Sequence, residues 1–225
     1  MERTVKKTSY HMQVYEFIKQ DILSGKLPCG ARINEYNLAK EFGVSRSPVR
    51  EAVRMLERDG FLVPGDNGAI VNPLEDKAVC DLYQTRMVLE SFAARDGVGK
   101  MTAETLDELK RCIERCKQAH AVGDTDEVVA QNTRFHEILC SCCGNEMILQ
   151  MISRQRDLSL LARRKEFFVY QKQQGAYLSE HEEIVHAIEQ GRPEEVERCM
   201  RRHIGHDLAF YQKQLEEKAE KGAQL

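Results

Sequence analysis

The sequence contains 225 residues, of which 42% are hydrophobic and 31% are charged, and its formal net charge at pH 7 is −3. This length allows one large domain or two small ones, whereas the acidic balance excludes a general nucleic-acid coat, so that any DNA binding must come from a local patch. The sequence has no apolar run long enough to span a membrane and no signal-peptide pattern, which predicts a cytoplasmic protein without a membrane partner.

Residues 1–74 have the pattern of a winged helix-turn-helix. Apolar residues at helical spacing predict helices at 10–24 and 34–42. Only Gly43-Val44 separates the second helix from a third, and two short helices joined by a tight turn make a helix-turn-helix. After the third helix, the runs FLV and AIV flank the turn sequence PGDNG and predict a two-stranded hairpin, the wing.

The third helix, within residues 43–60, carries a row of arginines. Its apolar stripe, which must face a core, consists of Val49, Ala52, Val53 and Leu56. Arg46, Arg50 and Arg54 recur every four residues along one flank of this stripe, and Ser45 or Ser47 can cap the helix. An isolated helix of this kind is often simply solvated on that flank. Because the second helix of a helix-turn-helix enters the major groove, we expect the arginines to contact DNA.

The segments LAKEFGV and SRSPVREAVRMLERDGFL resemble the signature of the GntR family of bacterial transcription regulators, over roughly residues 10–74. The resemblance implies a set of DNA-contacting residues: Ser45, Arg46, Ser47 and Arg50, with Gly68 in the wing approaching the minor groove. The chemistry agrees, because a guanidinium binds the guanine edge with two hydrogen bonds, while serine hydroxyls suit phosphates. Some relatives carry an arginine where this sequence has Tyr36, so we expect a changed operator preference.

Residues 75–225 are predicted to form an all-α bundle of six or seven helices. Helical periodicity covers the segments 76–98, 103–122, 125–143, 145–168, 178–190 and 193–220. Thr102, Asp124, Asn145 and Ser179 are predicted N-caps, and Ser179 is also predicted to form a capping box with Glu182. The expected fold class is therefore mainly α, with a winged helix-turn-helix domain at 1–74 and a helical domain at 75–225.

Three of the seven histidines are predicted to lie on apolar helix faces. His136 shares its face with Asn132, one turn earlier, while His181 and His203 each lie on the apolar face of a later helix. One such histidine is most often a hydrogen-bonded core residue. Three in one bundle, with one oxygen ligand, satisfy a divalent metal such as zinc, nickel or manganese.

The order of these residues resembles the FCD domain, the helical effector-binding domain of the FadR branch of the GntR family. The matching motifs are NTRFH at 132–136, EH at 180–181 and RRH at 201–203. The resemblance implies that Asn132, His136, His181 and His203 hold a metal at the floor of a pocket. Asn132 replaces the commoner aspartate, so we expect a lower metal affinity and a preference for an anionic ligand to complete the coordination.

Arg86 has two interpretations. It matches a position where relatives place an arginine that faces the pocket and a carboxylate effector. Alternatively, it is a surface arginine paired with Glu90 one turn away.

The eight cysteines follow no disulfide or zinc-ribbon spacing, and most are expected to be small core residues. A redox- or metal-responsive regulator that uses Cys112, Cys116 or the CSCC run at 140–143 remains an alternative.

Together these patterns predict a DNA-binding transcriptional regulator, expected to be a repressor. A homodimer would bind a palindromic operator, and a small organic acid bound near the metal would control that binding. A metal-dependent hydrolase is the enzyme alternative, but no carboxylate at a clear spacing offers a general base.

Overall fold

The computed structural model describes residues 9–66, 68–170 and 176–222. The chain divides into two compact units, Met1–Glu75 and Asp76–Leu225, which are described separately. In the predicted wing turn, Asn67 lies outside the described residues.

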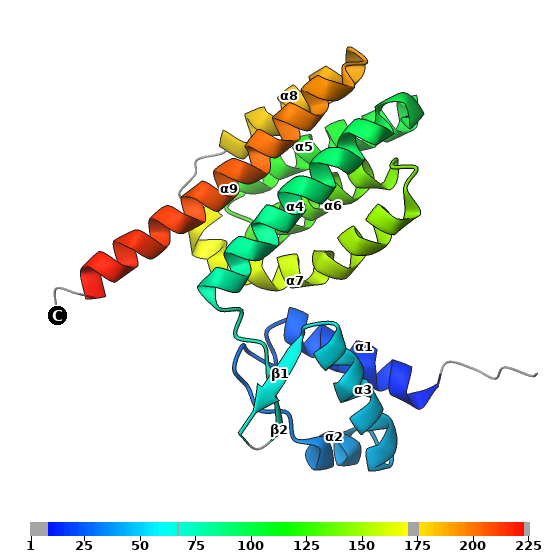
Figure 1. Ribbon diagram of the computed structural model, residues 1–225, viewed down its shortest axis with the longest axis vertical. Helices are drawn as coiled ribbons and strands as arrows, with labels where there is room; N and C mark the ends of the chain where they lie inside the picture. Colours follow the sequence, from blue (N-terminus) through cyan, green and yellow to red (C-terminus); the bar gives the residue numbers. More distant parts are fainter. Residues whose placement is uncertain (1–8, 67, 171–175, 223–225) are drawn as a thin grey trace, which may run out of the picture. The chain divides into compact units, whose positions relative to one another are not determined.

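The first unit contains three helices followed by a hairpin (Figure 1), as predicted. The helices are α1 (Tyr10–Leu23), α2 (Glu35–Glu41) and α3 (Arg46–Arg58). The strands β1 (Leu62–Gly65) and β2 (Gly68–Val71) pair antiparallel, with Leu62 opposite Val71 and Gly65 opposite Gly68. The Asn34 side chain accepts a hydrogen bond from the backbone N–H of Asn37, so a short polar side chain defines the start of α2.

The core of the first unit lies between α1, α3 and the hairpin. Ile18 and Ile22 of α1 and Leu56 of α3 are buried, as the helical spacing predicts. Phe17 of α1, although apolar and at helical spacing with Ile18 and Ile22, is not part of this core. It is mostly exposed and stacks on the ring of Phe42, because it lies at the edge of the face that α1 turns toward α3.

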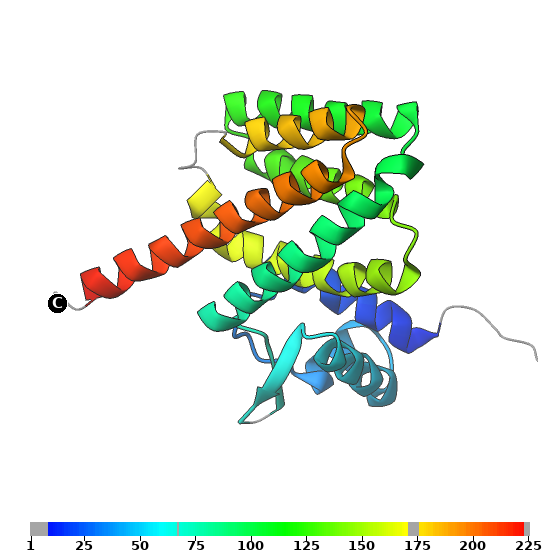
Figure 2. The ribbon, with the colours of Figure 1, turned by 45° about the horizontal axis from the view of Figure 1, so that its top comes forward.

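The second unit is a bundle of six long helices among its described residues, joined in one place by a short 3-10 turn (Figure 1). The helices are α4 (Asp76–Gly97), α5 (Ala103–Val122), α6 (Thr125–Ser141), α7 (Glu146–Tyr170), α8 (Ala176–Glu189) and α9 (Pro193–Gly222). α4 packs against α9, α6 and α7, and α5 packs against α6 and α8 (Figure 2). The predicted mainly α fold class is confirmed.

Three of the four caps predicted in the second unit are present. The Thr102 and Asp124 side chains accept hydrogen bonds from the first turns of α5 and α6, and Asn145 Oδ1 accepts from two backbone N–H groups of α7. Gly123 ends α5 in the left-handed region, with φ 72°, which a residue with a side chain adopts only at a cost.

The predicted cap at Ser179, and with it the capping box, is wrong. α8 begins at Ala176, so Ser179 lies inside the helix. The physical reason is that Tyr177 and Leu178 are buried against Cys116 of α5 and extend the apolar face of α8 toward its N-terminus. Among the described residues, no helix is both long enough and apolar enough to cross a bilayer.

Candidate functional site

The exposed N-terminal half of α3 is the first candidate site. The side chains of all four residues predicted here to contact DNA are exposed: Ser45, Arg46, Ser47 and Arg50. Burial of Val49 and Val53 on the adjoining face fixes the rotation of α3, so that the two arginines on its flank face solvent. The structure therefore brings these residues together on one surface, and their contact with DNA stays a prediction.

Glu35, which the sequence interpretation missed, lies beside both arginines. Its Oε2 is 3.7 Å from Arg46 Nη2 and 3.5 Å from Arg50 Nε. The arginine side chains are more than half exposed, and ion pairs of this kind contribute little because water and salt screen them. Both guanidinium groups therefore stay available to a stronger polyanion.

The hairpin presents Gly68 at its tip. Gly68 is exposed and its φ is +117°, a backbone conformation that favours glycine. With no side chain, its backbone can approach another molecule closely. The approach of Gly68 to a DNA groove is sterically open and stays a prediction.

The second candidate site is a cluster of three buried histidines inside the helical bundle. His136 comes from α6, His181 from α8 and His203 from α9. The Nε2 atom of His203 lies 3.2 Å from Nε2 of His181 and 3.2 Å from Nε2 of His136. One nitrogen from each ring lies within 4.8 Å of the others, an arrangement that can hold a metal ion. Helices far apart in the sequence therefore bring the three predicted histidines together.

Two carboxylates orient the cluster from outside. Oε2 of Glu90, on α4, lies 2.6 Å from Nδ1 of His136. Oε2 of Glu180, on α8, lies 2.7 Å from Nδ1 of His203. Burial acts to raise the pKa of Glu90, but the charge of Arg86 and the contacts with His136 hold it well below its ordinary value. Burial likewise opposes ionisation of Glu180, yet hydrogen bonds from His203 and His206 lower its pKa.

These carboxylates determine which ring nitrogens carry hydrogen. An ionised carboxylate only accepts, so Nδ1 of His136 and Nδ1 of His203 each donate. In a neutral ring the lone pair then resides on Nε2, which points into the cluster. His181 is held differently, because its ring stacks on Phe135 with ring centroids 4.0 Å apart.

Asn132, the fourth predicted ligand, is buried one helical turn before His136. Its Oδ1 atom is buried and has no hydrogen-bond partner among the described residues. A buried amide oxygen without a partner carries a desolvation cost, which a bound cation would remove.

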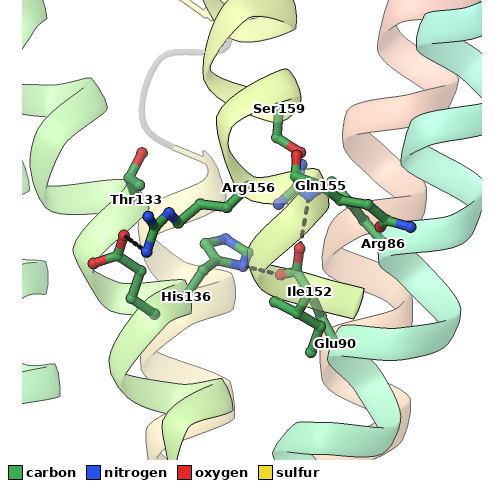
Figure 3. A pocket seen from close by; sticks show the side chains of 9 residues that line it. Arg86, Glu90, Thr133, His136, Ile152, Gln155, Arg156 and Ser159 are labelled. Carbon is green, nitrogen blue, oxygen red and sulfur yellow. Dashed lines mark hydrogen bonds and ion pairs between the residues drawn. The ribbon is translucent and has the colours of Figure 1, made fainter. Parts of the chain in front are cut away.

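A small cavity of about 40 Å³ adjoins the cluster, with His136 in its wall (Figure 3). Arg86 of α4 also lines this cavity, is only 3% exposed, and donates from Nε to Glu90 Oε1 at 2.7 Å. Each interpretation therefore holds in part. Arg86 borders the cavity and also pairs with Glu90. The predicted surface position is wrong, because the side chain is buried.

Sequence reasoning missed two further residues near the cluster. Arg156 of α7 lines the cavity, and its Nη1 atom lies 3.4 Å from Oε1 of Glu137. No sequence signal marked this position, because no periodic pattern distinguishes Arg156 from a solvated arginine. Glu180 precedes His181 in the EH motif, so its position beside the cluster had a sequence signal, but its partner His203 is 23 residues away.

Two family models match the chain. The model of bacterial regulatory proteins of the gntR family matches residues 11–70, and the FCD domain matches residues 81–206. The chain belongs to the GntR family. Its FCD domain is an effector-binding domain, and its helix-turn-helix binds operator DNA.

Relatives of this GntR-family chain are regulators as well. It is 33% identical over 214 residues to the "Uncharacterized HTH-type transcriptional regulator YdhC" of Bacillus subtilis, covering 94% of this chain and 95% of that protein. It is 30% identical over 173 residues to the "Gluconate operon transcriptional repressor" of Bacillus licheniformis, covering 73% and 71%. The solved structure of Escherichia coli McbR/YncC shares its fold, with a TM-score of 0.73, 22% identity, and coverage of 93% and 100%. The protein is thus a transcriptional regulator, and the metal-hydrolase alternative is excluded.

The cysteines of this GntR-family regulator offer little for redox sensing. Burial raises the pKa of the Cys112 and Cys140 thiols, and a protonated thiol is a poor nucleophile. The same cause raises the pKa of Cys142, Cys143 and Cys199.

Brief treatment of the folded protein with iodoacetamide should therefore modify Cys29, the exposed cysteine, well before the buried ones. Peptide mass spectrometry gives the order of modification. Early modification of Cys112 or Cys116, with a matching loss of operator binding, would restore the redox alternative.

Proposed function

We propose that the protein is a metal-dependent transcriptional repressor. It binds a palindromic operator as a homodimer, and a small carboxylate bound in the FCD cavity controls that binding. The observation that carries the proposal is the convergence of three buried Nε2 atoms beside a cavity that Arg86 lines. Because operator DNA lies in the bacterial cytoplasm, the proposal places the protein there.

The residues present fit a divalent transition metal. Nε2 of His136 and Nε2 of His203 lie 3.2 Å apart, and both Nδ1 atoms face carboxylates. Two neutral rings held in this way would direct lone pairs at each other, which is unfavourable unless a cation lies between them. Two nitrogens bound to one tetrahedral zinc are also about 3.3 Å apart, given Zn–N bonds of about 2.0–2.1 Å.

His136, His181, His203 and Asn132 would hold the metal. Because the three imidazoles and the amide oxygen are all neutral, the bound ion would keep its full positive charge, whether it is zinc, nickel or manganese. When bound, the metal would supply a positive charge that favours an anion in the adjoining cavity. Arg86 and Arg156 in the cavity wall offer guanidinium donors to a carboxylate, the proposed effector class, while Glu90 and Glu137 in the same wall offset their charges.

The homodimer proposal rests on symmetry and on exposed apolar side chains. One helix-turn-helix reads one half-site, so a palindrome requires two copies. In the second unit, Val88 and Phe92 of α4 and Met147 and Met151 of α7 are exposed at helical spacing on two helices that pack together. We propose this surface as the contact with the second copy.

The proposed function is tested by selecting operators from random duplexes with the full-length protein. We expect a palindromic consensus, and an affinity for it that changes when zinc-loaded protein is titrated with small carboxylates. A consensus with one half-site would contradict the dimer. An affinity that no carboxylate changes would contradict the effector class.

The Asn132→Asp variant should bind zinc more tightly, on the order of 10-fold or about 1.4 kcal/mol, because it restores a negative ligand. Calorimetric titration of zinc into both proteins measures the difference. Tighter binding by the wild type would rule out our assignment of Asn132 as a neutral ligand.

A further inference from the structure

We propose that Glu90 couples the cavity to the histidine cluster. One carboxylate is shared between a cavity arginine and a cluster histidine, so that an anion bound to Arg86 strengthens metal binding through His136. This inference rests on the proposed function, which places an anion in the cavity and a metal at the cluster, and it names how one site regulates the other.

Glu90 divides its two oxygens between two partners (Figure 3). Oε1 accepts from Arg86 Nε at 2.7 Å, and Oε2 accepts from His136 Nδ1 at 2.6 Å. All three residues are buried. Burial strengthens both contacts, because the surroundings have a low dielectric constant, and a change at one oxygen is therefore felt at the other.

Charge balance gives the direction of the coupling. The single negative charge of Glu90 offsets the positive charge of Arg86 and also polarises the imidazole of His136. An anion in the cavity offers Arg86 a second partner and draws it from Glu90. The carboxylate then acts more strongly on Nδ1 of His136, and Nε2 becomes a better donor to a metal. By linkage, the metal must strengthen binding of the anion by the same factor.

Glu180 provides a matched comparison within the same cluster. It holds Nδ1 of His203 as Glu90 holds Nδ1 of His136. Its second oxygen, however, contacts exposed His206, and Glu180 does not line the cavity. Glu180 therefore positions a cluster histidine but has no link to the anion.

The test is zinc affinity, measured by competition with a fluorescent chelator, in acetate and in chloride at equal ionic strength. Acetate is chosen because it is among the smallest carboxylates and the cavity is small. In the wild type, acetate should tighten zinc binding by about fivefold or more. Glu90→Gln and Glu180→Gln should each weaken zinc binding by about 10–100-fold. Only Glu90→Gln should abolish the effect of acetate.

A second variant, Arg86→Gln, tests the inference independently in case Glu90→Gln does not fold. Arg86→Gln removes the anion contact but leaves Glu90 on His136, so the effect of acetate should vanish while zinc still binds. An equal effect of acetate in the wild type and in Glu90→Gln or Arg86→Gln overturns the inference, because acetate would then act directly on the metal.

A metal-free measurement separates this inference from the metal proposal. In zinc-free protein, the ¹⁵N NMR signals of the His136 ring should move with acetate in the wild type and in Glu180→Gln, and markedly less in Glu90→Gln. If the wild type binds no zinc, the metal proposal fails, and these shifts still decide the coupling. Signals that do not move, or that move equally in Glu90→Gln, overturn it.

Discussion

The His136→Ala variant should contain almost no metal, whereas we expect the wild type to contain about one divalent ion per chain. His136 supplies one of three imidazoles in the cluster and is the one that also borders the cavity. Removing one ligand of four should weaken binding by at least about 100-fold, given the roughly 10–16 kcal/mol of a structural zinc site. Elemental analysis of tag-free protein measures the content directly.

His186→Ala is the control for this experiment. His186 is exposed on α8, the helix that carries His181, and it is not part of the cluster. Its removal should leave the metal content unchanged. A wild type that holds no metal, even after reconstitution with zinc, would make the three histidines polar residues of the cavity wall and leave the DNA-binding prediction intact.

Metal removal should also destabilise the folded protein. A ligand present at a thousand times its Kd stabilises the native state by about 4 kcal/mol, so stripping zinc with a chelator should lower the melting temperature by roughly 10 °C. The His136→Ala variant should show no such chelator effect. Its far-UV circular dichroism establishes that the helices still form.

The second large effect is expected at the DNA-binding surface. Arg50→Ala should weaken binding to the selected operator by about 1–3 kcal/mol and relax the base preference at one position of each half-site. Arg50 is exposed on α3 and bound only weakly by Glu35, so its guanidinium is available to a base edge. Titrations against the operator and against each single-base variant measure both effects.

Arg58→Ala is the matched control for this prediction. Arg58 is an exposed arginine at the far end of the same helix, paired with Asp59. Its loss should change operator affinity little. Equal weakening of operator and random DNA by Arg50→Ala would make Arg50 a phosphate contact, and the salt dependence of binding would then become shallower.

The sequence by itself determined the helices, the hairpin and most of the helix ends. The information is local: apolar residues at a spacing of three and four, Thr102 and Asp124 at helix starts, and turn residues in the wing. It failed at Ser179 because a cap signal competed with tertiary burial of Tyr177 and Leu178, and burial prevailed. For the candidate site, periodicity placed three histidines on apolar faces, and the family resemblance grouped them with Asn132.

Only the tertiary structure decided what meets these histidines. Periodicity gives the face of a helix that a side chain lies on, but not the helix that packs against that face. Glu90 is 46 residues before His136, so their hydrogen bond has no local signal. Arg86 is an intermediate case. Its spacing to Glu90 predicted the ion pair, but only the packing of α4 against α6 and α7 buries Arg86 beside a cavity.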